Sequence, residues 1–222
     1  MKRWGACFLV GLALLAVTPF TVPARAQEPV LGDGSYSPFI VGDGVLRLLY
    51  PTGWAPDGQA LDANTLVFFS DEALLGRPAD TAYAPGEASL ALTLIPTADL
   101  ERFGLPQNSV LQALLGIVGG LRASATDESG ASRLSWTLPQ FNPATGDRPE
   151  MAQASLSLPG EFERDLYLWP VSADLWALLA ASTAPGERAT LANSAEVMLQ
   201  SVQLDGTVEA LLAGFAELGG AS

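Results

Sequence analysis

The sequence predicts an α+β fold, and three features of the 222-residue chain support this class. About seven segments have the length and residue types of β-strands, because they are rich in Leu, Val and aromatic residues and are bounded by turn formers. Two or three other segments have the spacing of amphipathic helices. The two kinds do not alternate as they do in βαβ units, so a doubly wound parallel sheet is not expected.

The first half of the chain holds three strand-like segments. Val45–Tyr50 is followed by a proline, which cannot donate to a β-ladder. Thr65–Ser70 is a second apolar run. Ala88–Ile95 alternates small or polar residues with large apolar ones, and this period of two is typical of a half-buried strand.

Helical spacing follows. Apolar residues recur every three or four positions after Pro106 and before Gly119-Gly120, which provides a proline start and a glycine stop. They are Val110, Leu111, Leu114, Leu115 and Val118. Near the end of the chain, Glu187–Gln200 and Thr207–Leu218 each place apolar residues on one helical face, so two further helices are expected.

The remaining elements are predicted to be strands. The candidates are Leu121–Ala125, Arg133–Leu138, Met151–Leu158 and Asp165–Trp169. Leu175–Ala181 is a continuous apolar run that fits a central strand or a buried helix, and its bounded length together with the following Pro185-Gly186 favours a strand. Ser201–Leu204 is a short closing segment.

The residue types that are missing exclude much catalytic chemistry. The chain has no His, and its only Lys and only Cys are Lys2 and Cys7. Serine or cysteine catalysis with a histidine base, Schiff-base chemistry and the usual zinc, haem and iron–sulfur ligands are therefore not expected. Carboxylates, hydroxyls and arginines remain, which permit carboxylate-pair hydrolysis or oxygen coordination of a cation. We expect no catalytic residue, cofactor or metal site.

The first 26 residues have the form of an export signal. A positively charged start precedes the apolar stretch Cys7–Val17, which is too short to span a bilayer comfortably. Ala24–Ala26 then offers a small-x-small pattern, so cleavage is expected between Ala26 and Gln27. The alternative is an uncleaved N-terminal anchor. The later sequence has no apolar run of transmembrane length, so no transmembrane helix is expected there.

Loss of this segment would leave a strongly acidic chain. It holds three of the 11 basic residues and no acid, so 24 acidic residues would face eight arginines, a net charge of −16. Nucleic acid is excluded as a partner, because phosphate binding requires a basic surface. The expected location is periplasmic, cell-surface or extracellular. Without cysteine the exported chain gains no disulfide and depends on its core.

Two groups of turn and strand signals resemble the PsbP-like family. Tyr50–Trp54 reads Tyr-Pro-x-Gly-Trp after the first strand, and Phe68–Ser70 ends the second. Near the C-terminus, a Pro-Gly-Glu turn at Pro185–Glu187 precedes a helix and the closing segment Leu199–Leu204. The matching signals span residues 40–205. The family includes the extrinsic lumenal protein of photosystem II, the nuclear Ran-binding Mog protein and many exported bacterial proteins.

The resemblance implies an α/β/α sandwich with a central, mostly antiparallel sheet of about six to seven strands. The expected organisation is a signal peptide over 1–26, a flexible tether over 27–40, a PsbP-like domain over 41–205 and a C-terminal amphipathic helix over 206–222, packed on the domain. Family members mostly bind partners, which implies a binding role toward an unidentified protein or cell-envelope component. Metal positions in some members involve histidine, and this chain has none.

Several residues were considered as site candidates. Four tryptophans would line a ligand groove if they shared one face, although isolated indoles on strands are usually core residues. They are Trp54, Trp136, Trp169 and Trp176. The pairs Asp71-Glu72 and Asp127-Glu128 are expected in solvated turns, because neighbours on a strand point to opposite faces.

Other candidates have simpler interpretations. Asp33, Asp43 and Asp147 do not have the spacing of an EF-hand calcium loop. Ser70 and Ser201 have no base to activate them. The helix glycines do not form a phosphate-binding pattern; they are Gly116, Gly119 and Gly120.

Three functions remain open at this point. The favoured one is an exported, non-catalytic module that binds a protein or envelope component. A carboxylate-dependent extracellular hydrolase would need two acids facing each other across a cleft, roughly 5 to 10 Å apart. A small-ligand carrier would need an apolar pocket lined by the tryptophans.

Overall fold

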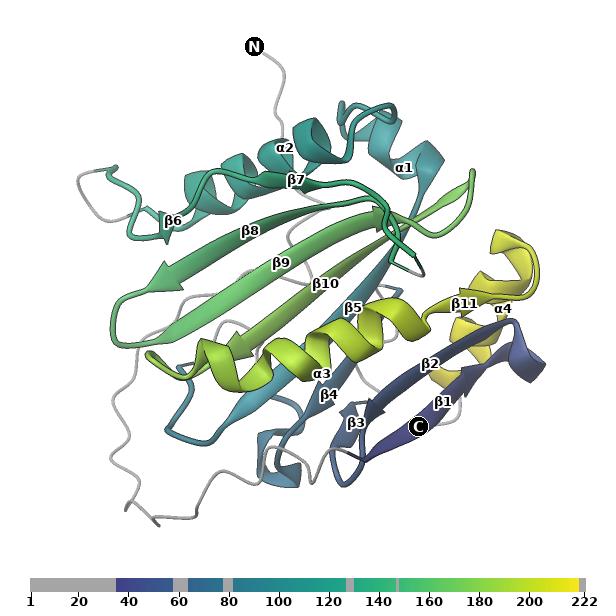
Figure 1. The fold of residues 1–222 in the computed structure, drawn as a ribbon, viewed down its shortest axis with the longest axis horizontal. Helices are drawn as coiled ribbons and strands as arrows, with labels where there is room; N and C mark the ends of the chain where they lie inside the picture. The colour runs from purple at the N-terminus through teal and green to yellow at the C-terminus, as the bar shows by residue number, and fades with distance from the viewer. Residues whose placement is uncertain (1–34, 58–63, 78–81, 127–129, 147, 220–222) are drawn as a thin grey trace.

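The computed structural model describes residues 35–57, 64–77, 82–126, 130–146 and 148–219 (Figure 1). In chain order the elements are β1 Tyr36–Val41, η1 Gly42–Gly44, β2 Leu46–Pro51, β3 Ala55–Asp57, β4 Thr65–Phe69, η3 Glu72–Leu74, β5 Ala88–Pro96, α1 Thr97–Arg102, α2 Val110–Ser124, β6 Ser135–Trp136, β7 Gln140–Asn142, β8 Met151–Leu158, β9 Phe162–Pro170, β10 Leu175–Thr183, α3 Arg188–Ser201, β11 Gln203–Leu204 and α4 Val208–Gly219. Strands and helices are segregated along the chain, so the α+β prediction is confirmed.

The larger sheet has eight strands within the described ranges, and every pair in it is antiparallel. Seven strands follow in the order β3-β4-β5-β10-β9-β8-β6, and β7 also pairs with β8. The sheet therefore has one strand more than the six to seven expected. The extra strands are short pieces at its two ends, where three-residue and two-residue segments carry weak sequence patterns.

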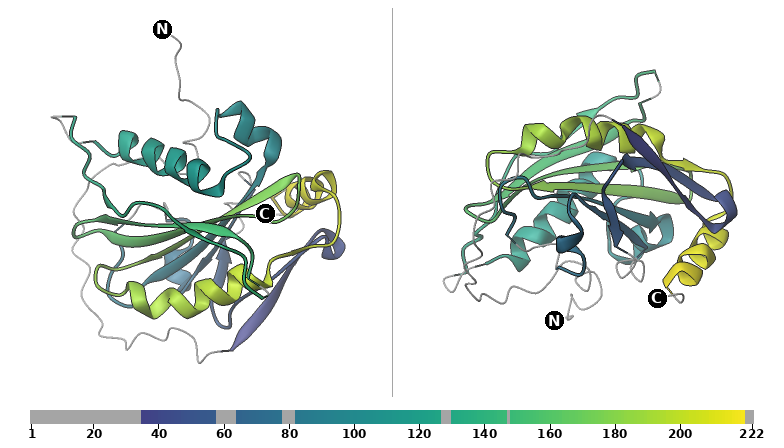
Figure 2. Two further views of the ribbon diagram at one scale, coloured as in Figure 1. Left: turned by 45° about the horizontal axis from the view of Figure 1, so that its top comes forward. Right: turned by 90° about the horizontal axis from the view of Figure 1, so that it is seen from below.

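A separate three-stranded sheet has the order β1-β2-β11. The larger sheet lies between α1 and α2 on one face and α3 with this small sheet on the other (Figure 2). The implied α/β/α sandwich is thus present, with the small sheet completing the layer that contains α3.

The sequence of the central strand β10 is apolar throughout because both faces of the strand are buried. Ala177 and Leu179 pack toward α3, whereas Trp176 and Leu178 pack toward α2. A strand buried on both faces loses the alternation of polar and apolar residues. The strand interpretation of Leu175–Ala181 is confirmed.

The predicted strand Leu121–Ala125 is wrong, because α2 continues to Ser124. Gly119-Gly120 does not end the helix, and neither glycine has a positive φ. The guanidinium of Arg122 lies 5.0 Å over the Trp136 ring, so tertiary contacts continue past the glycines. Glycine lowers helix propensity by about 1 kcal/mol, and such packing overrides it.

The expected tether over 27–40 is also wrong in part, because Tyr36–Val41 forms β1. Residues 27–34 lie outside the described ranges. The Phe39 ring meets Tyr50 and Phe68 at centroid distances of 6.2 and 5.3 Å, which ties β1 to the core. Local sequence concealed the strand because of Pro38. The Thr52 N–H bonds to Ser35 O, so by alternation Pro38 faces the free edge, where it costs no ladder bond.

The expected C-terminal helix is present as α4, whose residues contact η1 and β1. Leu211 and Phe215 are buried in the core cluster shared with α3. Across the described ranges, no helix is long and apolar enough to cross a membrane.

Candidate interaction surface

The four tryptophans are divided between the two faces of the larger sheet. Trp54 and Trp169 belong to the core under α3, and Trp176 belongs to the core under α2; all three are 2–4% exposed. Trp136 on β6 is partly buried beside the second core. Because the sheet separates these side chains, they do not line one groove. The core interpretation is confirmed for three of them, and a tryptophan-lined carrier pocket gains no support.

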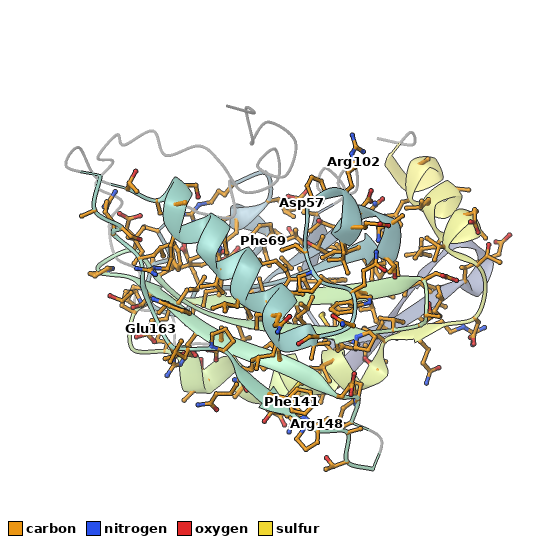
Figure 3. All side chains as sticks on the ribbon, turned by 90° about the horizontal axis from the view of Figure 1, so that it is seen from above. Asp57, Phe69, Arg102, Phe141, Arg148 and Glu163 are labelled. Carbon is orange, nitrogen blue, oxygen red and sulfur yellow. The ribbon has the colours of Figure 1, made fainter. Side chains whose placement is uncertain are left out.

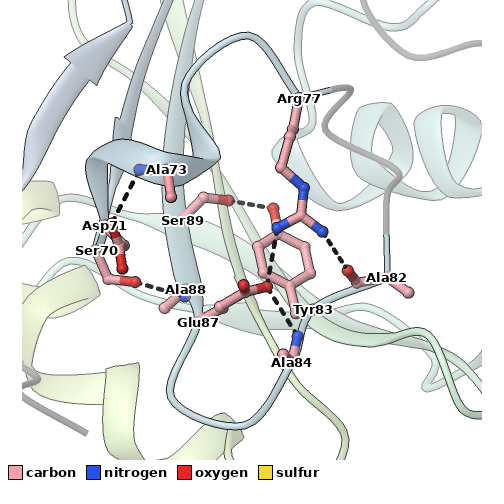
Figure 4. A network of polar contacts seen from close by, with 10 residues as sticks. All are labelled: Ser70, Asp71, Ala73, Arg77, Ala82, Tyr83, Ala84, Glu87, Ala88 and Ser89. Carbon is pink, nitrogen blue, oxygen red and sulfur yellow. Dashed lines mark hydrogen bonds and ion pairs between the residues drawn. The ribbon is translucent and has the colours of Figure 1, made fainter. Parts of the chain in front are cut away.

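Ser70 and Asp71 begin the loop between β4 and β5 and stabilise it by hydrogen bonds (Figure 4). The Ser70 hydroxyl accepts the Ala88 N–H at 2.8 Å, and the Asp71 carboxylate accepts the Ala73 N–H at 2.9 Å. Glu72 is exposed in the 3₁₀ turn that follows. These contacts confirm the turn interpretation of Asp71-Glu72. The other residues of the network are Arg77, Ala82, Tyr83, Ala84, Glu87 and Ser89.

The other sequence candidates do not form a site. Asp33, Asp127, Glu128 and Asp147 lie outside the described residues. Asp43 lies in the turn η1. Ser201 accepts the Leu49 N–H at 2.8 Å and donates to Met198 O at 2.9 Å, a structural role. In the described part of the chain no three acidic residues gather as metal ligands.

Asp165 on β9 is the one buried acid among the described residues, at 8% exposure. Its cross-strand neighbour Ser155 donates a hydrogen bond of 2.5 Å, and the Arg188 guanidinium of α3 lies 3.7 Å away. Burial raises the pKa of the Asp165 carboxyl, while Ser155 and Arg188 lower it. The hydrogen bond and the ion pair of Asp165 are to a hydroxyl and a guanidinium. The nearby carboxylate of Glu163, two residues along the same strand, also raises the pKa of Asp165, but these two acids do not face each other across a cleft, so a hydrolytic acid pair gains no support here.

A largely apolar surface lies along α2 and the β6–β7 segment. Leu138, Phe141 and Leu115 are 72%, 49% and 46% exposed, and they make up half of the six exposed large hydrophobic residues in the described ranges. Figure 3 shows Phe141 at the edge of the molecule. Single exposed apolar residues are common, whereas exposed apolar residues grouped on adjoining elements are a candidate for an interaction surface.

Helix geometry joins the two parts of this surface. Leu115, Gly119 and Arg122 are spaced at i, i+4 and i+7, so they follow one stripe of α2. The stripe meets β6 where Arg122 stacks on Trp136. We call this surface the α2–β7 face; it consists of Leu115, Gly119, Arg122, Trp136, Leu138 and Phe141.

A bulge in the edge strand exposes Leu138. Thr137 lies opposite Ser155, since its N–H bonds to Ser155 O at 2.9 Å and its hydroxyl accepts the Ser155 N–H at 2.9 Å. Gln140 already lies opposite Gln153. The edge strand thus advances by three residues where β8 advances by two, so it contains one extra residue. This residue interrupts the alternation of side chains between the two faces of the sheet. The predicted strand Arg133–Leu138 is reduced to Ser135–Trp136 for the same reason.

Comparisons with known proteins give similarities of fold. No protein-family model matches the chain. No curated protein sequence matches it. Cyanobacterial PsbP from Synechocystis sp. PCC 6803 has a TM-score of 0.49 and 14% identity over 78% of this chain and 95% of its own. The Ran-binding protein Mog1p of Saccharomyces cerevisiae has a TM-score of 0.48 and 11% identity over 77% and 95%.

A third solved structure, LpqN of Mycobacterium tuberculosis, is described as involved in cell envelope biogenesis. It has a TM-score of 0.35 and 16% identity over 76% of this chain and 90% of its own. PsbP and Mog1 are therefore found again among solved structures, as the resemblance in the sequence implied. At these identities the similarity concerns the fold and transfers no site residue.

Sequence reasoning did not identify the α2–β7 face. The apolar spacing predicts Leu115 on the buried side of its helix and Leu138 within a strand. One usable signal was present in the sequence, because α2 has a single charged residue, Arg122, over its 15 positions. A helix with one face in water normally carries several charges on that face.

Proposed function

We propose that this protein is an exported, non-catalytic module that binds another protein or envelope component through the α2–β7 face. The observation that carries the proposal is the exposure of Leu138 and Phe141 at the bulged edge of the sheet. The missing His, and the restriction of Lys and Cys to Lys2 and Cys7, support a role without catalysis. The signal-like first 26 residues support export.

The energetics favour burial of this face by a partner. Leu115, Leu138 and Phe141 would each contribute roughly 1.5 to 3 kcal/mol if they were fully covered. The edge beside them offers no continuous ladder, because Pro139 lacks an N–H and the bulge interrupts the strand. A partner would therefore be held by side-chain contacts rather than by an added strand.

Photo-crosslinking in cells tests the proposal. A photoreactive phenylalanine analogue at position 138 or 141 should give adducts with a discrete partner band. The same analogue at Leu75 should give none, because Leu75 is 42% exposed but lies after β4, near the opposite edge of the larger sheet. Equal adducts at all three positions, or none at any, would reject the α2–β7 face as a binding surface.

Export is tested on the same cells. Mass spectrometry of the envelope or secreted fraction should find a chain that begins at Gln27. Recovery of the protein only from the cytoplasm, with residues 1–26 retained, would reject export and leave the crosslinking result to decide the binding role.

A further inference from the structure

We propose that the segment bound by the α2–β7 face carries a carboxylate beside apolar side chains, and that Arg122 recognises this carboxylate. The inference rests on the proposed binding function and adds the chemistry of the partner. Three independent observations support it, namely the environment of Arg122, the distribution of acidic residues and the glycines of α2.

Arg122 and Arg102 are the described arginines without an ion pair or a polar side-chain partner, and Arg102 is exposed at the end of α1. Five of the eight described arginines have a carboxylate oxygen within 4.0 Å; they are Arg47, Arg77, Arg133, Arg148 and Arg188. Arg164 is buried and donates to Ser182. Arg122 instead stacks on Trp136, and its Nε is buried without a hydrogen-bond partner among the described residues. Stacking orients the planar guanidinium, and because Nε is buried the two terminal nitrogens are the donors that would meet a carboxylate end-on.

The acidic residues of the chain are concentrated elsewhere. Residues 103–146, which contain α2, β6 and β7, hold two of the chain's 24 acids, Asp127 and Glu128. The rest of this strongly acidic protein would repel a negatively charged segment, whereas α2, β6 and β7 contribute no acidic side chain to the α2–β7 face. A basic partner would be drawn to the other surfaces instead.

Two of the three glycines of α2, Gly119 and Gly120, are not required by the packing of the chain itself, whereas a Cβ at Gly116 would lie 2.5 Å from the Leu105 side chain. A Cβ at Gly119 or Gly120 would meet no atom within 4 Å, so alanine would fit at both positions and favour the helix. Gly119 lies between Leu115 and Arg122 on the exposed stripe. Glycine at this position allows another backbone to approach the helix closely.

Two other occupants fit less well. A second copy would bring the same face in a two-fold dimer, and α2, β6 and β7 contain no carboxylate to meet Arg122. A lipid surface is bound by several basic side chains around an apolar group, whereas this face has one arginine. A protein segment that carries a carboxylate beside apolar side chains would bury the exposed apolar residues of this face and pair with Arg122.

A random peptide library displayed on phage tests the chemistry without a known partner. Peptides are selected on the wild-type protein and counter-selected on a Leu138→Ser/Phe141→Ser variant. Leu138 and Phe141 are exposed, so this variant should fold normally. Asp or Glu adjacent to apolar residues should be enriched. Enrichment of Lys or Arg, or no acidic preference, would overturn the inference.

Calorimetric titration of one selected peptide and of its Glu→Gln form provides the quantitative test. The wild type should bind the acidic form roughly tenfold more tightly, as expected for one charge-assisted hydrogen bond. Arg122→Gln should remove this difference, while the matched control Arg102→Gln, on the exposed end of α1, should retain it. Gly119→Ala should weaken both peptides equally and raise the stability of the fold. Retention of the tenfold preference in Arg122→Gln would overturn the role of Arg122.

The outcomes separate this inference from the proposed function. Crosslinks at position 138 that persist unchanged in Arg122→Gln would keep the binding role and overturn the carboxylate preference. Vesicles of phosphatidylethanolamine and phosphatidylglycerol provide the lipid alternative. Binding to them that is lost in Leu138→Ser, without any selected peptide, would assign the face to a membrane and overturn the inference. Absence of crosslinks, peptides and vesicle binding would overturn both.

Discussion

Helix α4 touches the turn η1 through two glycines, and replacement of Gly214 by alanine probes that contact directly. A Cβ at position 214 would lie 2.8 Å from the Gly42 Cα, 3.1 Å from the Gly42 N and 3.2 Å from the Val41 Cγ1. Non-bonded carbons pack at about 3.5 to 4.0 Å, so the new methyl group would have to move away by roughly 0.7 Å or more. The closest atoms are backbone atoms of a turn in which Gly42 has a φ of 56°, so they cannot rotate away.

The magnitude follows from two opposing terms. Alanine in place of glycine inside a helix contributes about 1 kcal/mol of stability. Overpacking in a fixed environment costs about 1 to 3 kcal/mol, and partial separation of α4 would also expose Leu211 and Phe215, which are 0% and 2% exposed. We therefore expect Gly214→Ala to lower the free energy of unfolding by about 1 to 2 kcal/mol.

Gly120→Ala is the matched control, because it is also a glycine-to-alanine change inside a helix but its Cβ would meet nothing within 4 Å. It should raise the free energy of unfolding by about 0.5 to 1 kcal/mol. Urea unfolding followed by circular dichroism measures both variants, with similar m-values expected. Equal stabilisation by the two substitutions would show that α4 does not approach η1 as described.

Three further predictions concern ionisation and exposure. Burial raises the pKa of the Asp165 carboxyl above 3.8, so the folded state binds this proton more tightly than the unfolded state does. The wild type therefore loses stability as the pH rises through the folded pKa, and Asp165→Asn should gain stability relative to the wild type over that interval. A difference in stability that does not depend on pH would contradict this prediction. Burial, with the nearby charges of Asp165 and Glu196, raises the pKa of Tyr167 to about 12. Tyr167 therefore stays protonated near pH 10 in the folded protein, and the tyrosine titration of folded Tyr167→Phe near this pH should match that of the wild type. In a Trp4→Phe background, Trp136→Phe should remove most acrylamide quenching, because Trp54 and the two other indoles are 2–4% exposed; quenching that survives would place another indole at the surface.

Local patterns were sufficient where one interaction dominated. The strand Met151–Leu158 has the predicted bounds, because alternate burial of its side chains produces a period of two in the sequence. The helix over Arg188–Ser201 was likewise visible from Leu191, Ala195 and Met198, which recur on one face and are buried. In these segments the spacing of apolar residues and the secondary structure have the same cause.

Local patterns failed where distant residues decide the outcome. Gly119-Gly120 indicated a helix end, but contacts of Val118 and Arg122 with the sheet carry α2 through both glycines. Pro38 concealed β1, whose place is fixed by pairing with Leu49 and by the rings beneath it. Propensity is a weak term, worth about 1 kcal/mol or less per residue, and tertiary packing outweighs it.

The sequence alone determined which chemistry is absent, since a missing histidine is missing in every fold, and it determined the α+β class through the periods of its apolar residues. Only the tertiary structure decided which apolar side chains remain exposed. Leu138 and Leu134 are both leucines in one strand-like segment, yet one is 72% and the other 8% exposed. The difference arises from a bulge fixed by Ser155 on β8, and from the position of α2 over the sheet. The exposure of a side chain is set by the residues that pack against it in the folded protein, and the order of residues along the chain does not specify which residues these are.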